Sequence, residues 1–214
     1  MKKFFITATG TEIGKTYFMC QLIHKLRAKQ QQVKALKPVI TGLDFNADYS
    51  ASDSALILQA LDIEPSKTNI QKISPFHFEP ALSPDSAALI EQKPYLDFAK
   101  LSRYCTDFLA ATDADYALIE GAGGIMVPLD EQHLILDLLK ILDIPILLIA
   151  DNYLGMRSHS LTALETLKAH GLENITLLVN NICGDETSFA QNLNSLQKFT
   201  DVPCSSFTDF LAKI

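Results

Sequence analysis

Residues 7–16 have the sequence TATGTEIGKT, which follows a short apolar run and precedes a segment with helical spacing. Lys15 and Thr16 match the end of the common phosphate-binding loop, G-x-x-x-x-G-K-S/T. That pattern requires a glycine at position 9, but Thr9 stands there and the glycine is Gly10. The stretch therefore predicts either a nucleotide-binding loop with a displaced glycine or an ordinary turn between a strand and a helix.

Short apolar runs alternate along the chain with longer amphipathic segments. The runs of strand length are 2–8, 32–38, 115–120, 144–150 and 174–180. The middle runs are apolar at both odd and even positions, as in strands buried on both faces of a parallel sheet. Helical spacing recurs around 18–26, 134–142 and 161–167. This alternation predicts one α/β domain over residues 1–214, with a mostly parallel central sheet and helices on both faces.

Composition limits the classes of function. The chain has 214 residues, 48% of them hydrophobic, and a net charge of −7, which argues against nucleic-acid or membrane partners. The chain has no apolar stretch of about 18 residues, the length of a membrane span, so we expect a cytoplasmic protein. The cysteines show no paired spacing and are expected to be small buried side chains in a reducing compartment. They are Cys20, Cys105, Cys183 and Cys204.

The proline-rich segment 62–95 is the least regular part of the chain. Long excursions of this kind within a domain tend to be functional or to carry a small helix.

Polar and glycine-rich residues follow several of the predicted strands directly. Residues 10–16 follow the first strand, Lys37 ends the second, Glu120 opens the cluster EGAGG after the third, and 180–181 are Asn-Asn after the fifth. Ligands of open parallel sheets bind beyond the carboxyl ends of the strands, so these groups should meet at one edge.

The residue types at this edge suit a nucleotide and a metal ion. Backbone N–H groups at a helix N-terminus bind phosphate, and Lys15 adds a full positive charge. The Thr16 hydroxyl and the carboxylates of Asp53 and Glu120 are oxygen ligands of the kind that Mg²⁺ prefers. Taken alone, Asp53 could simply begin a helix and Lys37 could be a solvated strand end. Together the residues favour a nucleotide and metal site.

Seven stretches carry a resemblance to one family over nearly the whole chain: GTEIGKT, ALKPVITG, SDSALIL, FEPALSP, DYALIEGAGGIMVPL, ADNYLG and LLVNN. The sequence resembles the dethiobiotin synthetases, P-loop enzymes of biotin biosynthesis. The family loop has one more residue between its glycines than the common pattern. Here Ala8 stands where the first glycine of that loop is expected, and Gly10 lies at a variable position. We expect alanine to be tolerated there if its φ is negative.

The resemblance implies ATP- and Mg²⁺-dependent carboxylation and ring closure of 7,8-diaminononanoate with CO₂ to dethiobiotin, ADP and phosphate. The implied path runs through a carbamate and a carbamic-phosphoric anhydride. The implied residues are Gly10, Thr11, Glu12, Ile13, Gly14, Lys15, Thr16 and Asn181 for ATP; Thr16, Asp53 and Glu120 for the metal; Lys37, Thr41, Gly121, Leu154 and Gly155 for the substrate. Lys37, Lys15 and Thr11 are the implied catalytic residues.

The family also implies a homodimer, with the substrate site near the subunit interface and the loop 153–159. Two positions depart from the family pattern: Tyr153, where lysine is frequent, and Asp85, where histidine is frequent. The alternative is a nucleotide-switch ATPase of the partitioning type, which shares the fold. Those proteins carry a second lysine early in the loop, at the position of Gly10, so the ligase is favoured.

Overall fold

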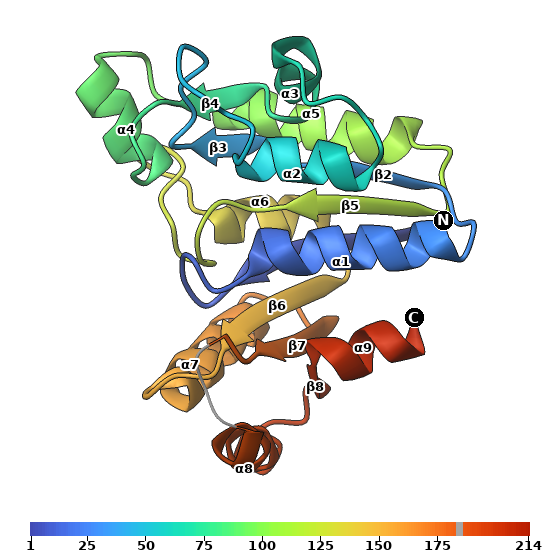
Figure 1. The fold of residues 1–214 in the computed structure, drawn as a ribbon. Helices are drawn as coiled ribbons and strands as arrows, with labels where there is room; N and C mark the ends of the chain where they lie inside the picture. The colour runs from blue at the N-terminus through green and yellow to red at the C-terminus, as the bar shows by residue number, and fades with distance from the viewer. Residues whose placement is uncertain (183–185) are drawn as a thin grey trace.

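A parallel six-stranded sheet forms the centre of the molecule (Figure 1). The computed structural model describes residues 1–182 and 186–214, and only the main chain of residues 186–188. The strand order is β2-β5-β1-β6-β7-β8, and every neighbouring pair is parallel. The strands are β1 Lys2–Ala8, β2 Val33–Leu36, β5 Tyr116–Glu120, β6 Ile146–Asp151, β7 Ile175–Asn180 and β8 Cys204–Ser206. The five predicted strands are confirmed, with ends within two residues of the expected ones.

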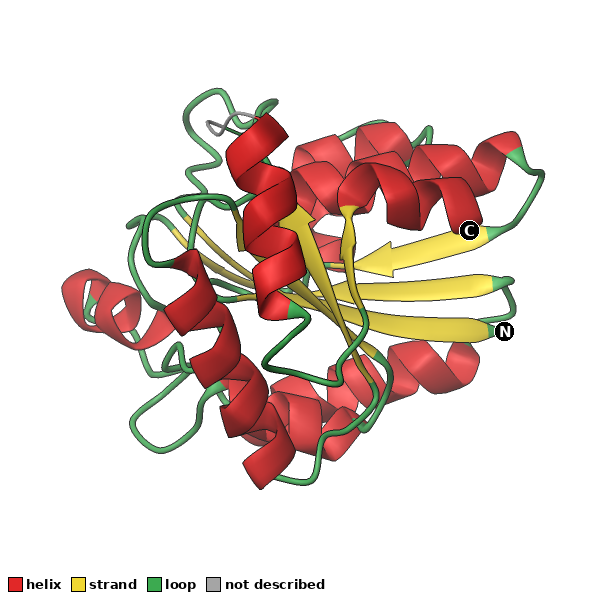
Figure 2. Cartoon of the chain, turned by 90° about the horizontal axis from the view of Figure 1, so that it is seen from below, coloured by secondary structure: helices red, strands yellow, loops and turns green. Residues whose placement is uncertain are grey.

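Helices cover both faces of the sheet, as predicted (Figure 2). They are α1 Lys15–Ala28, α2 Asp53–Ala60, α3 Lys67–Ile73, α4 Pro84–Glu91, α5 Phe98–Ala111, α6 Ile135–Leu142, α7 Met156–Ala169, α8 Glu186–Leu196 and α9 Phe207–Lys213. Helices α1, α2 and α9 lie on one face, and α5, α6 and α7 on the other (Figure 1).

Alternation along β1 explains why two separate cores form. Successive side chains of a strand point to opposite faces, so Phe5 packs into the core on one side and Ile6 into the core on the other. Both side chains are fully buried. Because β1 pairs with β5 on one side and β6 on the other, the loop after Ala8 lies at the middle of the carboxyl edge.

The segment 62–95 contains more regular structure than the sequence indicated. It holds α3 and α4 and the strand β4 Phe76–Phe78, which pairs in parallel with β3 Val39–Thr41 in a small second sheet. These strands have three residues each, too few for alternation to distinguish a strand from a loop. The small sheet and α4 lie beside the carboxyl edge of the main sheet, so this segment reaches the site region (Figure 1).

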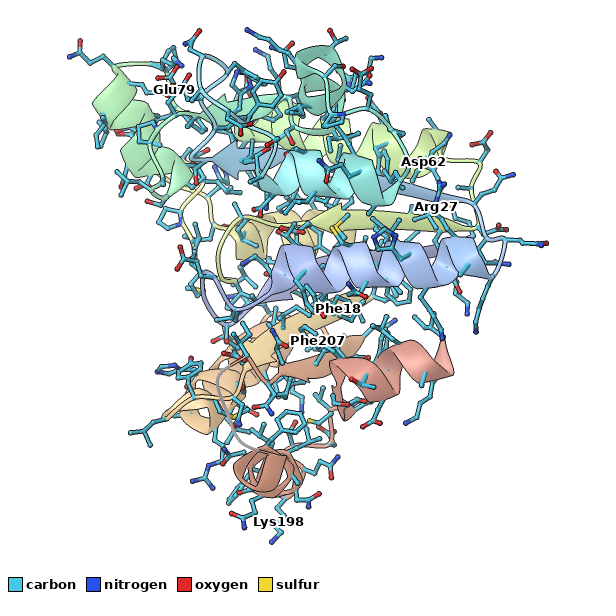
Figure 3. All side chains as sticks on the ribbon, in the orientation of Figure 1. Phe18, Arg27, Asp62, Glu79, Lys198 and Phe207 are labelled. Atoms are coloured by element: carbon cyan, nitrogen blue, oxygen red, sulfur yellow. The ribbon has the colours of Figure 1, made fainter. Side chains whose placement is uncertain are left out.

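The C-terminal helix α9 packs on α1 through aromatic side chains, a contact that the sequence did not indicate. Phe18 from α1 and Phe207 from α9 point toward each other, with ring centroids 4.8 Å apart (Figure 3). Farther along α1, Arg27 forms an ion pair of 3.6 Å with Asp62, beyond the end of α2. Both contacts lie on the face of the sheet that α1 covers, so α1 is held by its neighbours on both sides.

The cysteine prediction is confirmed in part. Cys20, Cys105 and Cys204 are free thiols; Cys105 is buried and the other two are half-buried. Burial raises the pKa of Cys105 to about 12. Cys183 lies outside the described residues. Across the part of the chain that the structure describes, none of the helices combines the length and apolar character needed to cross a membrane.

Candidate functional site

A cavity of about 630 Å³ opens at the carboxyl edge of the sheet, beside the start of α1. Eight of the predicted site residues line it: Thr11, Glu12, Gly14, Lys15, Thr16, Lys37, Thr41 and Asp53. They come from the loops after β1 and β2, from β3 and from the starts of α1 and α2. The structure therefore brings these eight residues together around one cavity.

The two glycines of the loop after β1 have different conformational roles. Gly14 has φ +97° and precedes α1, and a Cβ there would lie 2.5 Å from Nδ2 of Asn180. Gly10 does not have a positive φ, and a Cβ there would meet nothing within 4 Å. Ala8 also lacks a positive φ, which explains why the family glycine is dispensable there. Glu12 turns the loop instead, with φ 59°.

We expect Gly14→Ala to destabilise the ligand-free protein by at least about 1–2 kcal/mol, the cost of placing a side chain in the left-handed region. The contact with Asn180 adds to that cost. Gly10→Ala is the matched control and should leave the free energy of unfolding within about 0.5 kcal/mol of the parent value. Urea unfolding of the three proteins without nucleotide measures both effects. Equal stabilities for the two variants would contradict this account of the loop.

Lys15 is a buried cation whose ammonium group contacts main chain. Its Nζ donates a hydrogen bond of 3.2 Å to the carbonyl of Gly10, and the residue is 7% exposed. Among the described residues no carboxylate forms an ion pair with it. Burial and, to a smaller extent, the nearby charge of Lys37 lower the pKa of Lys15 to about 8. An anion bound at the loop would therefore supply the counter-charge that Lys15 lacks.

The remaining charged residues of the site form a connected cluster. Nζ of Lys37 lies 2.6 Å from Oε1 of Glu120 and 2.9 Å from Oδ2 of Asp53. The Thr16 hydroxyl donates a hydrogen bond of 2.7 Å to the same Glu120 oxygen. Burial alone would raise the pKa of Asp53, but Lys37, with smaller contributions from Thr16 and Lys15, lowers it below its ordinary value. Asp53 is also the first residue of α2, so it both begins a helix and faces the site.

The cluster fits a magnesium ion. Mg²⁺ takes one or two carboxylates and completes its shell with phosphate oxygens and water. Thr16, Asp53 and Glu120 supply a hydroxyl and two carboxylates, and Oε2 of the buried Glu120 has no hydrogen-bond partner in the described part of the chain. Within residues 1–182 and 186–214 there is no group of three or more His, Cys, Asp or Glu side chains that could hold a metal ion. A metal ion at this cluster would therefore also need the hydroxyl, phosphate oxygens or water as ligands.

Seven apolar residues, here called the apolar wall, also line the cavity and were not predicted. They are Val39, Ile40, Leu56, Ala81, Leu82, Pro84 and Val127. Residues 81–84 belong to the motif FEPALSP, which carried the family resemblance but to which no site role was given. They enter the cavity because the small β3–β4 sheet brings the start of α4 beside the carboxyl edge. The cavity is thus lined by both charged and apolar side chains.

Several predicted residues lie away from this cavity. Gly121 faces the core, since a Cβ there would lie 2.9 Å from the ring of Phe5. Oδ1 of Asn181 accepts a hydrogen bond of 3.0 Å from Asn152. Leu154 and Gly155 line a separate cavity of about 270 Å³ at the start of α7. Ile13 packs against the apolar core under α1. The assigned roles of these residues stay predictions.

Comparison with known proteins identifies relatives over nearly the full length. Residues 2–206 match a family model described as an AAA domain. An ATP-dependent dethiobiotin synthetase BioD from Methylobacterium nodulans is 40% identical over 190 residues, covering 87% of this chain and 84% of the relative. Proteins of the same name from Caulobacter vibrioides (39% identity, 93% and 88% coverage) and Legionella pneumophila (30%, 100% and 96%) also match.

Solved structures share the fold at low sequence identity. The MinC:MinD cell division protein complex of Aquifex aeolicus matches with a TM-score of 0.57 and 13% identity, covering 100% of this chain and 86% of that one. The signal recognition particle receptor FtsY from Elizabethkingia anophelis matches with a TM-score of 0.51 and 15% identity, covering 95% and 57%. These likenesses establish a P-loop type of fold and nothing about the reaction.

Proposed function

The chain belongs to the dethiobiotin synthetase family, and we propose that it forms dethiobiotin from 7,8-diaminononanoate, CO₂ and ATP in the cavity at the start of α1. In this proposal residues 1–214 act as one domain. The observation that carries it is the position of Lys37, which lies on the same cavity as the phosphate-binding loop and the apolar wall. A second substrate with an apolar carbon chain, such as diaminononanoate, could pack on that wall.

The loop and α1 would bind the triphosphate. Backbone N–H groups at the N-terminus of α1 carry partial positive charge, and Lys15 adds a full charge beside them. Thr16, Asp53 and Glu120 would hold Mg²⁺, which supplies charge neutralisation at the phosphates when bound. Lys15 regains a counter-charge in this complex, so the energy spent on burying it is recovered as ATP affinity.

The second substrate would lie between Lys37 and the apolar wall. One amine adds to CO₂ and loses a proton, which gives a carbamate. A carbamate oxygen attacks the γ-phosphorus and the bond to ADP breaks; the second amine then closes the ring and phosphate leaves. Lys37, Thr11 and Thr41 line the cavity where the carbamate would form, and they orient it and balance its charge. Because both nucleophiles belong to the substrate, the protein contributes positioning and charge.

Isotope labelling tests this reaction directly. Incubation of the protein with ATP, Mg²⁺, diaminononanoate and ¹³C-bicarbonate should give dethiobiotin that is one mass unit heavier, with the label in the ring carbonyl. Omission of ATP should abolish the product. If the protein hydrolyses ATP under these conditions and no labelled dethiobiotin forms, the proposed function is wrong.

The substrate site would be completed by a second copy of the chain, through the loop before α7. Leu154 at the tip of this loop is fully exposed, and the hydroxyl of Tyr153 lies 2.6 Å from Nδ1 of His159. Gly155 has φ +100° and precedes α7. The N–H group of Met156 donates to the carbonyl of Tyr153, whereas those of Arg157 and Ser158 make no backbone hydrogen bond within the described residues. Those N–H groups are suited to a carboxylate such as the tail of diaminononanoate.

We expect Leu154→Asp to raise the KM for diaminononanoate about tenfold or more and to weaken dimerisation, since a charge replaces an apolar contact. ATP binding should not change, because the loop does not line the main cavity. Ile63→Asp introduces the same charge at another exposed apolar position and serves as the control. Sedimentation and steady-state kinetics measure the two effects; a fully active monomer would contradict the shared site.

A further inference from the structure

The ammonium group of Lys37 lies between the two carboxylates that would hold Mg²⁺. It contacts Oε1 of Glu120 at 2.6 Å and Oδ2 of Asp53 at 2.9 Å. The hydroxyl of Thr16 contacts the same Glu120 oxygen at 2.7 Å. The cation that the protein itself supplies is therefore held by one oxygen of each carboxylate, while Oε2 of Glu120 stays without a partner in the described part of the chain.

This contact answers an electrostatic need of the ligand-free protein. Glu120 is fully buried and Asp53 stands beside it, and a buried carboxylate without a counter-charge is strongly destabilising. Burial by itself would lower the pKa of Lys37, yet the carboxylates of Glu120 and Asp53 raise it above its ordinary value. Lys15 does not fill this role, because its ammonium group donates to the carbonyl of Gly10.

A metal ion and the Lys37 ammonium group would be held by the same two carboxylates. Mg²⁺ binds its oxygen ligands at about 2.0–2.1 Å, well inside the contacts that Nζ makes with Glu120 and Asp53. A divalent cation among these oxygens would therefore meet a like-charged group at close range.

We propose that Lys37 is the resident counter-ion of the Asp53–Glu120 pair in the metal-free protein and that its side chain leaves this position when a divalent cation binds. The inference rests on the proposed function for the identity of the metal-binding residues. It adds that the two carboxylates always have a cation beside them. In the metal-free protein this cation is the Lys37 ammonium group, and in the nucleotide complex it is the metal ion.

The main chain around Lys37 is fixed, so the exchange involves the side chain alone. The N–H group of Lys37 donates to the carbonyl of Ile73 at 3.0 Å, and its own carbonyl accepts from the Ser74 hydroxyl at 2.7 Å. Ser74 is in turn hydrogen-bonded to Ser54 of α2. The displaced ammonium group has the main cavity to enter, where Thr11 and Thr41 lie. Metal binding would thus move a positive charge toward the second substrate.

Metal affinity without nucleotide tests the exchange. Mn²⁺ serves as a paramagnetic probe for Mg²⁺, and its binding is followed by electron paramagnetic resonance on the full chain. Lys37→Met should bind Mn²⁺ at least about tenfold more tightly than the parent protein, because the ion no longer displaces a cation. Lys34→Met is the matched control. It removes a positive charge from β2, just before Lys37, where Lys34 forms an exposed ion pair with Asp113. This variant should leave the affinity for Mn²⁺ unchanged.

Thermal unfolding gives a second expectation for the same variants. Without metal, Lys37→Met should melt below the parent protein, since Glu120 loses its counter-ion. Mg²⁺ should raise the melting temperature of Lys37→Met more than that of the parent. A folded Lys37→Met protein that binds Mn²⁺ no more tightly than the parent would overturn the inference.

A measurement on the unmodified chain decides the question if Lys37→Met does not fold. The ammonium signal of ¹⁵N-labelled lysine, assigned with Lys37→Arg, should be protected from exchange in the metal-free protein. It should shift or disappear when Mg²⁺ and ADP are added. An unchanged Lys37 signal at saturating Mg²⁺ and ADP would refute the exchange.

These readouts do not depend on turnover, so the two proposals fail separately. If dethiobiotin forms and the Lys37 signal is indifferent to metal, the exchange is wrong and the proposed function stands. If the metal affinity and the signal change as expected but no dethiobiotin forms, the exchange is supported and the proposed function is wrong.

Discussion

Lys15→Met should lower the rate of dethiobiotin formation at least about a hundredfold, the usual effect of removing one donor to a charge that develops in the transition state. Lys15 lies at the first turn of α1 and, among the described residues, is not engaged by a carboxylate. Its charge is therefore free for the terminal phosphates. Methionine keeps most of the apolar stem and removes the charge, so the loss reports on electrostatics and not on packing.

The stability of this variant provides an independent check. Because burial already lowers the pKa of Lys15 to about 8, removing its charge should not lower the melting temperature of the ligand-free protein. Lys25→Met, on the same helix but away from the cavity, is the control for turnover and should retain full activity. A folded Lys15→Met protein with near-normal ring closure would show that the loop does not bind the reacting phosphates.

Lys37→Gln should reduce ring closure by at least about a hundredfold while nucleotide binding is preserved. The carbamate develops negative charge as it approaches the anionic γ-phosphate. Two like charges about 4 Å apart repel by about 4 kcal/mol at an effective dielectric of about 20, which a cation between them offsets. Lys37 lies on the cavity and contacts Asp53 and Glu120, the carboxylates proposed to hold the metal, so it is close enough to take this position.

Lys37→Arg separates charge from shape. The guanidinium group keeps the charge, but its planar fork is larger than an ammonium group and suits neither the space between Asp53 and Glu120 nor a point contact with a carbamate. We expect it to lose much of the activity as well. Calorimetry with ATP and Mg²⁺, paired with product analysis, measures both variants. Loss of nucleotide binding together with product formation in Lys37→Gln would place Lys37 in the ATP site.

The parts of the fold that the sequence predicted are those with local signals. β1, the loop and α1 are contiguous, so an apolar run, a G-K-T ending and helical spacing suffice to place them. The convergence of Lys37 and Glu120 also follows from sequence, because both residues come at the carboxyl end of a strand. Their direct contact does not: it requires β2 and β5 to be neighbours in the sheet, and strand order carries no local signal.

The apolar wall illustrates the same limit. Residues 81–84 reach the cavity because β3 pairs with β4. The paired residues Val39 and Phe76 are 37 positions apart in the sequence. Three-residue strands have no recognisable period, so neither the small sheet nor the wall was predicted. The closeness of Asn180 to Gly14 also depends on the tertiary fold. It explains why position 14 requires glycine, which the sequence motif shows but does not explain.

Phosphate release from ATP tests the central claim, that hydrolysis of the nucleotide is coupled to ring closure in this cavity. The rate is measured with Mg²⁺ and ATP alone, then with diaminononanoate, with bicarbonate, and with both. The account predicts rapid release only when both are present, with one phosphate released for each dethiobiotin formed. Equal phosphate release with and without the two substrates would contradict it and would favour a nucleotide-switch ATPase.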